Sequence, residues 1–378
     1  MNPSRPHKEE TGLHKGPPKL KDIAVQAGVS IPTVSVILGG GPKAEMYSAK
    51  TRRKVWALAR EMGYTPNLLA RSLKSGKSKI IGVVMSNQYN SYYGRPLRAA
   101  EQKAAELGYE IMTADMKWDF SRFERCIQMM ASWNVEGLIL MTGGRLVNTS
   151  MISMLRDTGI PYVKGGVFHP DDACSTIVFN SHDAGRLMAR HLFEMGHRHV
   201  GFIAAHASNV TSEERIRGVM TMAREMKIPE DCLKVIHPPD ANVGLDTGYR
   251  LLDETLRCHP QLTAMLFHSD KMAIGGMRLL HEKGLSVPAD ISVAGFDDIC
   301  LDQSNDPNER LGGYLWPALT TVRTPMDEIG MECVRMLVEM MQNPSLRETP
   351  RTTVFPPKLV VRESTGPAAT KSVRTKII

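Results

Sequence analysis

Short apolar runs alternate with segments of helical periodicity from residue 79 to about residue 363. The runs form two series: one covers 79–85, 109–113, 137–141 and 161–163, and one begins near Thr176 and continues at 199–203, 234–236, 263–267 and 291–295. Such alternation predicts parallel sheets with helices on both faces. Two series in about 280 residues predict two lobes, each a doubly wound parallel sheet. Ligands of such folds bind at the carboxyl ends of the strands, here between the lobes.

The charge of the chain is concentrated at its N-terminus. Residues 1–78 contain 14 Lys and Arg against 5 Asp and Glu, whereas residues 79–378 contain 33 against 35, which together give the net charge of +7. Clustered cations favour phosphate binding because they release the counterions of DNA. Charge alone would favour a solvated basic tail.

Two short amphipathic helices are predicted within this basic segment. Their apolar positions are Leu20, Ile23, Ala24 and Ala27, then Val29, Val34, Ile37 and Leu38. Gly28 permits the positive φ of a sharp turn, Ser30 is a suitable N-cap, and Pro32 is tolerated in a first helical turn. The pattern predicts a helix-turn-helix whose second helix enters the major groove. Its outer N-terminal part would contact DNA through Ser30, Ile31, Pro32, Thr33, Ser35 and Val36.

A third helix and a short fourth one are expected next. Ser48 can cap the third, Val55, Leu58, Ala59 and Met62 form its buried stripe, and Gly63 ends it. The segment 64–74 has a Pro start, a possible cap at Asn67, and exposed leucines at 68, 69 and 73. A helix this short needs a partner to be stable.

At this point the chain resembles the lactose-repressor and galactose-repressor (LacI/GalR) family of bacterial transcription regulators. The motifs that carry the resemblance in the head are Lys21-Asp-Ile-Ala, Ala27-Gly-Val-Ser, Thr33-Val-Ser, Ser48-Ala-Lys-Thr-Arg and Gly63-Tyr-Thr-Pro-Asn, followed by Ala70-Arg-Ser-Leu73. The resemblance extends from about residue 19 to 365. It implies a homodimer that binds a near-palindromic operator, with Asn67, Ala70, Arg71 and Leu73 on a hinge helix that inserts Leu73 into the minor groove.

Two departures from the family pattern concern the head. Val36 stands where many relatives have arginine, and Ile31 and Pro32 lead the recognition helix, so none of the three donates a side-chain hydrogen bond. Base recognition is therefore expected to depend on thymine methyl groups and DNA shape. The segment 39–47 is longer than usual. We expect a flexible loop rather than a phosphate cradle, because no strand precedes it and no Gly-Lys-Ser/Thr follows.

For the body, the resemblance extends to periplasmic sugar-binding proteins. Its motifs include Gly196-His-Arg-His-Val, Arg215-x-x-Gly218, Ser269-Asp270, Phe296-Asp-Asp298 and Pro317-Ala-Leu-Thr-Thr-Val322. The implied organisation is a flexible arm (1–18), a DNA-binding domain (19–66), a hinge helix and linker (67–78), a core (79–363) and a flexible tail (364–378). Lobe 1 would comprise 79–179 and 319–345, and lobe 2 would comprise 180–318 and 346–363.

The same resemblance nominates effector-binding residues. Arg215 would donate paired hydrogen bonds from its guanidinium to ligand hydroxyls or a carboxylate. Asp297 would accept hydrogen bonds from two vicinal hydroxyls. Ser269 occupies a position where relatives often have Asn, while Asp270 is expected to cap the next helix rather than to bind ligand. Tyr93 would lie against the ligand face, with a surface tyrosine as the alternative.

Two positions bear on the identity of the ligand. Gly166 stands where many relatives have Asp, and Lys164 lies two residues earlier on the same strand face. Together with Arg215 this favours an anion, either a sugar acid or a sugar phosphate, although a lysine that snorkels to solvent is an equal alternative. The longer stretch 302–313 is either a flap or a surface loop.

Other classes of function find little support. No esterase elbow, His-Glu-x-x-His, phosphate loop or Cys-x-x-Cys is present, so we expect neither an enzyme nor a cofactor or metal site. The pair His197 and His199 is better explained as a helix C-terminal turn than as metal ligands. No run approaches the roughly 18 apolar residues of a membrane helix, and residues 1–19 lack a signal pattern, so a cytoplasmic protein is expected.

The sequence therefore predicts a ligand-responsive repressor. Release from DNA by an inducer and tighter binding with a corepressor both remain open. A solute-binding protein has no use for residues 20–74. An architectural DNA protein has no use for the two lobes. Residues 364–378 lack a leucine heptad series, which predicts a dimer without further assembly.

Overall fold

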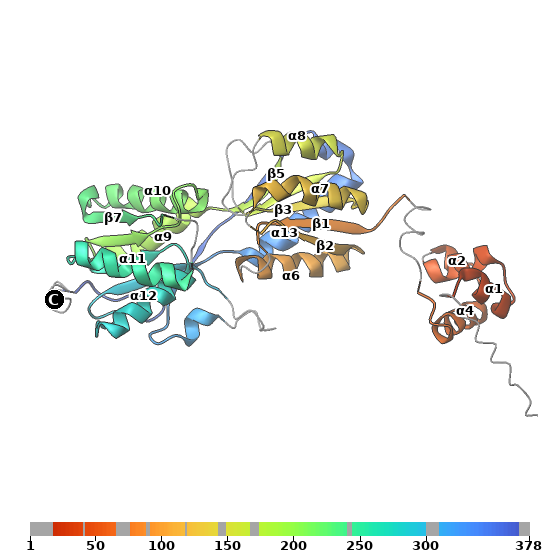
Figure 1. Ribbon diagram of the computed structural model, residues 1–378, viewed down its shortest axis with the longest axis horizontal. Coiled ribbons are helices and arrows are strands. Elements are labelled where there is room, and N and C mark those ends of the chain that lie inside the picture. The colour runs from red at the N-terminus through yellow and green to blue at the C-terminus, as the bar shows by residue number, and fades with distance from the viewer. Residues whose placement is uncertain are drawn as a thin grey trace, which may run out of the picture. The chain divides into compact units, whose positions relative to one another are not determined.

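The chain divides into two compact units at residue 78. The computed structural model (Figure 1) describes residues 18–40, 42–65, 76–87, 91–117, 119–142, 149–166, 174–239, 244–299 and 310–369. The predicted arm up to residue 17 and most of the predicted hinge, including Asn67, Ala70, Arg71 and Leu73, lie outside the described residues.

The first unit is helical. It contains α1 (Leu20–Ala27), α2 (Ile31–Gly39), α3 (Pro42–Glu45) and α4 (Ala49–Glu61). Gly28 ends α1 with φ +68°, and the Ser30 and Ser48 hydroxyls accept the amides of Thr33 and Thr51 as N-caps. The three predicted helices up to Gly63 and the caps at Ser30 and Ser48 are confirmed, because each depends on local spacing. Their shared core consists of Ile23, Ala24, Ala27, Val34, Ile37, Leu38, Val55 and Ala59.

The segment 39–47 was predicted as a flexible loop, and this prediction is wrong in part. Residues 42–45 form the short helix α3, which begins at Pro42. Buried Ala44 holds α3 against the rest of the unit.

The second unit contains two six-stranded sheets. The first has the order β11-β5-β4-β3-β1-β2, and all of its pairs are parallel. Its strands are β1 (Ile80–Met85), β2 (Glu110–Asp115), β3 (Gly137–Met141), β4 (Tyr162–Gly166), β5 (Ser175–Phe179) and β11 (Thr352–Phe355). One face packs against α6 (Ser91–Glu106) and α13 (Met326–Gln342), and the other against α7 (Phe123–Ser132) and α8 (Thr149–Asp157).

The second sheet has the order β12-β10-β9-β8-β6-β7, and only β12 is antiparallel. Its strands are β6 (Val200–Ile203), β7 (Leu233–Ile236), β8 (Ala264–Phe267), β9 (Ser292–Asp297), β10 (Thr320–Arg323) and β12 (Lys358–Val360). Helices α9 (Ser181–Glu194) and α10 (Val210–Glu225) cover one face, and α11 (Leu245–Cys258) and α12 (Asp270–Glu282) cover the other. Short 3-10 turns are η1 (Phe120–Arg122), η2 (Glu230–Cys232), η3 (Leu311–Tyr314) and η4 (Pro344–Arg347). The predicted fold class, a helical head with two doubly wound sheets, is confirmed.

The predicted division of the lobes is wrong at two strands. Residues 319–345 were assigned to lobe 1, but β10 pairs with β9 of the second sheet; residues 346–363 were assigned to lobe 2, but β11 pairs with β5 of the first. Partners within the second lobe fix β10, since the Thr321 hydroxyl donates to Asp270 at 2.6 Å. In the described residues the chain passes between the sheets after β5, after β10 and after β11.

The predicted tail begins too early. Ser364 is fully buried, and its hydroxyl donates to the Val293 carbonyl at 2.6 Å. The Ala368 amide donates to the Met195 carbonyl at 3.0 Å. Residues 364–368 are therefore part of the second lobe, because small polar side chains can be buried when their hydrogen bonds are satisfied.

None of the described helices is by itself long and apolar enough to cross a membrane. Taken together, α1 and α2 meet the length and composition of a span, but they are bent by 106°. Their apolar residues form the core of the first unit.

The contact between α9 and α10 generates a prediction about Gly218. A Cβ at this residue would lie 2.0 Å from the His182 carbonyl oxygen. We expect Gly218→Ala to lower the free energy of unfolding by about 1–3 kcal/mol through overpacking. The control is Gly94→Ala, since a Cβ there meets no atom within 4 Å and alanine should stabilise α6 by roughly 0.5–1 kcal/mol. Denaturant titration measures both, and equal effects would contradict the close crossing.

Candidate DNA-binding and effector sites

The outer surface of α2 carries the residues predicted to contact DNA. Ser30, Ile31 and Pro32 are exposed, and Thr33, Ser35 and Val36 are half-buried, while Val34 and Ile37 point into the core. The Thr33 and Ser30 hydroxyls lie 2.9 Å apart, so part of their hydrogen-bonding capacity is used within the cap. The exposed surface of α2 is thus largely apolar, as the sequence predicted.

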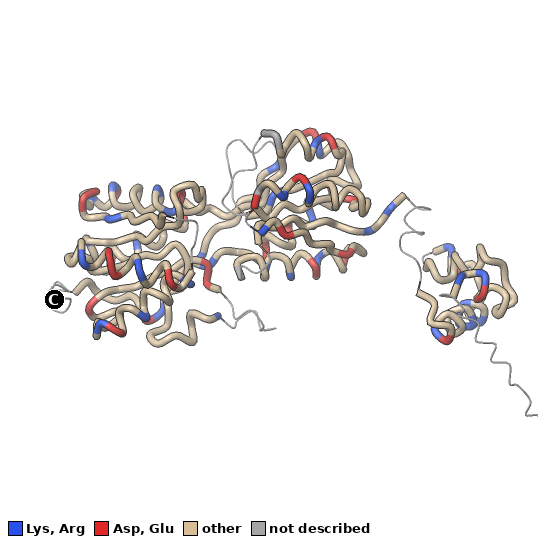
Figure 2. Tube along the Cα trace, viewed as in Figure 1, with Lys and Arg blue, Asp and Glu red and all other residues tan. Residues whose placement is uncertain are grey.

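Basic residues gather on α4, next to α1 and α2 (Figure 2). Lys50 and Arg53 are exposed, which suits contact with phosphates. Lys54 has a different role, because its Nζ donates to the Ala27 carbonyl at the C-terminus of α1 at 2.9 Å. A cation is favourable there because helix C-termini carry partial negative charge.

In the second unit, Arg215 and Asp297, two of the residues predicted to bind the effector, form an ion pair. Arg215 on α10 is 1% exposed; its Nη2 donates to Asp297 Oδ1 at 3.1 Å and its Nη1 to the His268 carbonyl at 2.6 Å. The guanidinium lies 4.4 Å from the centre of the Phe296 ring and 5.9 Å from that of Phe179. Since Phe179 ends β5 of the first sheet, this arginine lies where the two lobes meet.

Burial governs the electrostatics around this pair. It raises the pKa of Asp297 even though Arg215 and Lys271 act to lower it. Burial, with the help of Arg215, lowers the pKa of His268 well below its usual range, so this imidazole is neutral. Asp297 also has φ +105°, an uncommon conformation for a residue other than glycine, of the kind that gathers at functional sites.

The helix cap predicted at Asp270 is provided by Ser269 instead. The Ser269 hydroxyl caps α12 by accepting the Met272 amide at 3.4 Å, whereas Asp270 had been expected to be the cap. Asp270 is structural, as expected, but it accepts the Thr321 hydroxyl and the Ile299 amide. Its pKa is well above the usual range because it is buried and lies close to Asp297.

Tyr93 is not a surface tyrosine. It is 3% exposed in the core under α6 and α13, where burial raises its pKa to about 12. Its neighbour Tyr92 packs edge-on against it, with 5.2 Å between the ring centres. Burial and Asp297 raise the pKa of Tyr92, which Arg215 opposes, so Tyr92 is the tyrosine beside the predicted pair. The sequence suggested a tyrosine at this place. It could not tell which of the two adjacent tyrosines lies beside Arg215 and Asp297.

Lys164 is 2% exposed on β4. Snorkelling to solvent is therefore excluded, and the lysine is buried near the carboxyl end of the first sheet. At Gly166 an added Cβ would meet no atom within 4 Å.

A second acidic residue, which the sequence did not single out, adjoins the site. Asp298 is fully buried; it accepts Arg323 Nε and Arg362 Nη2, each at 2.7 Å, and its carbonyl accepts Arg310 Nη1 at 3.2 Å. Burial opposes ionisation, but the bonds from Arg362 and Arg323 prevail and lower the pKa of Asp298. The only signal in the sequence was its place in the Phe-Asp-Asp motif.

His197 is a core residue. It is fully buried just after α9, and its ring nitrogens lie within 2.8–3.1 Å of the Thr263 hydroxyl, the Ser292 hydroxyl and the Gly366 carbonyl. The predicted position after the helix is confirmed, but the reason for a histidine there is this set of hydrogen bonds. Among the described residues no cluster of His, Cys, Asp and Glu is suited to a metal ion.

Comparison with known proteins identifies relatives of both units. Residues 19–67 match the family described as bacterial regulatory proteins, lacI family, and residues 189–365 match the periplasmic binding protein-like domain. The HTH-type transcriptional repressor PurR of Escherichia fergusonii is 30% identical over 349 residues, which cover 91% of this chain and 96% of the repressor. Relatives with such names confirm the prediction that the chain is not an enzyme.

Solved structures give the same result. The lac repressor dimer bound to operator and the anti-inducer ONPF is 26% identical and superposes with a TM-score of 0.78 over 93% of this chain and all of that one. The complex of the transcriptional regulator CelR with cellobiose is also 26% identical, with a TM-score of 0.65 over 92% of this chain and 99% of that one.

The Arg215–Asp297 pair generates a prediction about pH. We expect Arg215→Met to lower the free energy of unfolding by about 3 kcal/mol near pH 8, because it leaves the Asp297 carboxylate buried without its cation. Its folded-state pKa then rises further above the unfolded value. The destabilisation is therefore smallest at low pH, where the carboxyl is protonated in both states, and grows as pH rises through the folded pKa.

Thermal unfolding at pH 5 and pH 8 measures this difference. The control is Arg217→Met on the same helix, because its side chain is 65% exposed and pairs with Glu214, so it should have little effect at either pH. A loss of stability in Arg215→Met that does not depend on pH would contradict the role given to Asp297.

Proposed function

Because this chain belongs to the LacI family of bacterial regulatory proteins and is a DNA-binding transcriptional repressor, we propose that a small molecule bound between its lobes controls its hold on an operator. The observation that carries the proposal is the buried Arg215. Its guanidinium contacts Asp297, His268 and Phe296 of the second lobe and lies over Phe179 of the first. A ligand that replaces one of these partners of the guanidinium would alter contacts in both lobes.

For the DNA, we propose that α2 enters the major groove of a near-palindromic operator, and that residues 67–78 form the hinge helix and linker. Support comes from the exposed Ile31 and Pro32, which suit contact with thymine methyl groups. The exposed cations of α4 suit the flanking phosphates. Operator DNA would place this action on the nucleoid, in the cytoplasm.

For the effector, we propose a sugar, sugar acid or sugar phosphate. Arg215 and Asp297 supply a planar set of donors next to an acceptor, the arrangement that vicinal hydroxyl groups require. Tyr92 takes the place first given to Tyr93 on the first-lobe side. Ser269 contributes through its cap on α12, which holds His268 and Asp270 at the carboxyl end of β8.

The proposed coupling follows from where the chain crosses between lobes. The crossing after β10 begins at Arg323, which binds Asp298, the residue next to Asp297. A change at Asp297 would thus act beside the crossing and shift one lobe against the other. Release of the operator by an inducer and tighter binding with a corepressor follow from the same linkage with opposite sign.

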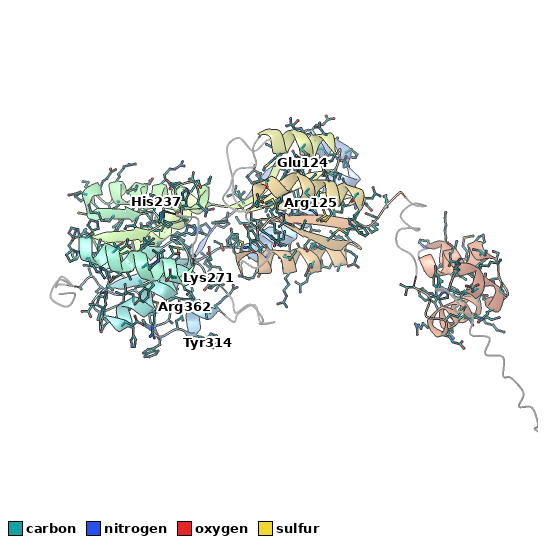
Figure 3. All side chains as sticks on the ribbon, viewed as in Figure 1. Glu124, Arg125, His237, Lys271, Tyr314 and Arg362 are labelled. Carbon is teal, nitrogen blue, oxygen red and sulfur yellow. The ribbon has the colours of Figure 1, made fainter. Side chains whose placement is uncertain are left out.

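We also propose a homodimer without higher assembly. The exposed large apolar side chains of the second lobe include Leu245 at the start of α11, which is 53% exposed, Tyr314, which is 71% exposed, and Trp316, which is 91% exposed. Figure 3 shows Tyr314 on the outside of this lobe. Exposed aromatic groups of this kind are typical of protein interfaces, and a second copy supplies the matching surface.

The dimer is tested with charges at the aromatic side chains. Light scattering should give the wild-type protein a mass near twice 41.9 kDa. Tyr314→Lys combined with Trp316→Lys should raise the dimer dissociation constant at least tenfold, because like charges then meet across the twofold axis. Met226→Lys, at the end of α10 on the opposite face of the sheet, is the control and should remain dimeric. A tetramer, or an unaffected double variant, would contradict the proposal.

The coupling is tested with two variants of opposite effect. An operator is first selected from random DNA with the full chain, and DNA binding is followed by fluorescence anisotropy with and without effector. Leu73→Ala should weaken operator binding at least tenfold, about 1.4 kcal/mol, while effector affinity is unchanged. Arg215→Met should bind the operator but lose the response to effector. The control for Leu73 is Leu107→Ala, at an exposed leucine of the second unit. A full response in Arg215→Met would overturn the proposed site.

A further inference from the structure

Helix α2 has no side chain that can recognise a base through paired hydrogen bonds. Its sequence from residue 31 to 39 is Ile-Pro-Thr-Val-Ser-Val-Ile-Leu-Gly, so it contains no charged and no amide side chain. In the major groove, Arg and Lys distinguish guanine, Asn and Gln distinguish adenine, and Asp and Glu accept from cytosine. Because α2 lacks all of these residues, it must distinguish base pairs by another property.

The hydroxyl groups at the start of α2 do not supply that property. The Ser30 and Thr33 hydroxyls lie 2.9 Å apart, and the Ser30 hydroxyl also accepts the Thr33 amide, so both belong to the N-cap. The third hydroxyl, on Ser35, is half-buried. A hydroxyl can donate or accept, so it binds donor and acceptor groups on base edges alike. These groups therefore discriminate little between bases.

The rest of the outer face of α2 is apolar. Ile31 is 45% exposed, Pro32 is exposed and Val36 is half-buried, and all three point away from the core of the unit. We call these three residues the apolar patch. Four residues of helix rise about 6 Å and successive base pairs lie about 3.4 Å apart, so the patch spans roughly two base-pair steps.

The group that an apolar patch can recognise in the major groove is the C5-methyl group of a pyrimidine. Thymine carries this methyl group, and 5-methylcytosine carries one on the same ring carbon. The two bases differ at position 4, where thymine has a carbonyl acceptor and cytosine an amino donor. Only a polar side chain distinguishes a donor from an acceptor, and the patch contains none. The two methylated bases are therefore equivalent partners for it.

We propose that the apolar patch binds the C5-methyl groups of pyrimidines whether the base is thymine or 5-methylcytosine, so that methylation of cytosines at these positions of the operator strengthens binding. The inference rests on the proposed function, since it requires α2 to enter the major groove. It names the chemical feature of the DNA partner that α2 recognises. Occupancy of the operator then responds to cytosine methylation as well as to the effector.

The test changes one DNA base at a time. In an operator selected from random DNA with the full chain, each thymine of a half-site and its symmetry mate are replaced by deoxyuridine, by cytosine or by 5-methylcytosine, with guanine opposite the cytosines. Deoxyuridine pairs with adenine as thymine does and lacks only the methyl group. Fluorescence anisotropy at constant salt gives the dissociation constants, because affinity for DNA depends on salt.

Burying one methyl group strengthens binding by roughly fourfold. At the positions that contact the patch, deoxyuridine or cytosine in both half-sites should therefore weaken binding about tenfold or more. We expect 5-methylcytosine at the same positions to restore binding to within about threefold of thymine.

Protein variants assign the effect to the patch. In Ile31→Ala the difference between thymine and deoxyuridine at one position should fall below about twofold, and Val36→Thr, which keeps the shape but replaces a methyl group with a hydroxyl, should reduce it at a neighbouring position. Val25→Ala is the matched control, because Val25 on α1 is 73% exposed and lies outside the patch, so the full difference should remain. Combining variant and DNA change separates direct contact from an effect of the methyl group on DNA shape.

The outcomes separate this inference from the proposed function. A selected operator that binds equally well with thymine and deoxyuridine at every position overturns the inference and leaves the proposed function intact. Binding of 5-methylcytosine no tighter than that of cytosine also overturns it, because position 4 is then recognised. A methyl effect that persists in both Ile31→Ala and Val36→Thr overturns the assignment to the patch. A random library in which no sequence is enriched contradicts the proposed binding to an operator, and the inference with it.

Discussion

Arg215 is the group on which the arrangement of the second unit depends. A guanidinium that is 1% exposed has lost its hydration, and its stability requires acceptors within the protein. Asp297 and the His268 carbonyl supply them, and Phe296 supplies a ring face. Packing holds the arginine in this position: a Cβ on Gly185 of α9 would lie 2.1 Å from the Arg215 carbonyl oxygen, so only glycine allows α9 and α10 to approach this closely. The chemistry of the site thus depends on a helix crossing.

The next residue extends the site to the crossings between the lobes. Asp297 and Asp298 both have positive φ, at +105° and +50°, and their carboxylates at the end of β9 bind different arginines. Asp298 binds Arg323 at the end of β10 and Arg362 after β12. Between these two arginines the chain crosses to the first sheet after β10 and returns to the second sheet after β11. One strand end therefore connects the Asp297 carboxylate of the proposed effector site to the segments where the chain crosses between the lobes. This proximity gives a ligand at Asp297 a short mechanical route to the rest of the chain.

The sequence could predict the features that local spacing decides, and it could not predict the features that tertiary packing decides. The caps at Ser30 and Ser48, the turn at Gly28 and most strands were predicted, because spacing and residue type decide them. Membership of β10 and β11 in their sheets was not, because short threonine-rich strands have no feature that selects a neighbour. Tyr92 was missed for a related reason: adjacent tyrosines on one helix differ by about 100° in direction, and only packing decides which one is buried.

The two lobes contribute unequally to the site, and this constrains how a ligand can act. The second lobe holds Arg215 through contacts that exist without ligand, so binding there alone gives no preference for one arrangement of the lobes. Preference arises only from groups that a ligand reaches on the first lobe, where Tyr92 and Phe179 already lie near the arginine. A ligand that also engages the first sheet gains free energy only when the lobes approach each other. The part of the effector that contacts the first lobe therefore sets both its specificity and the strength of the switch.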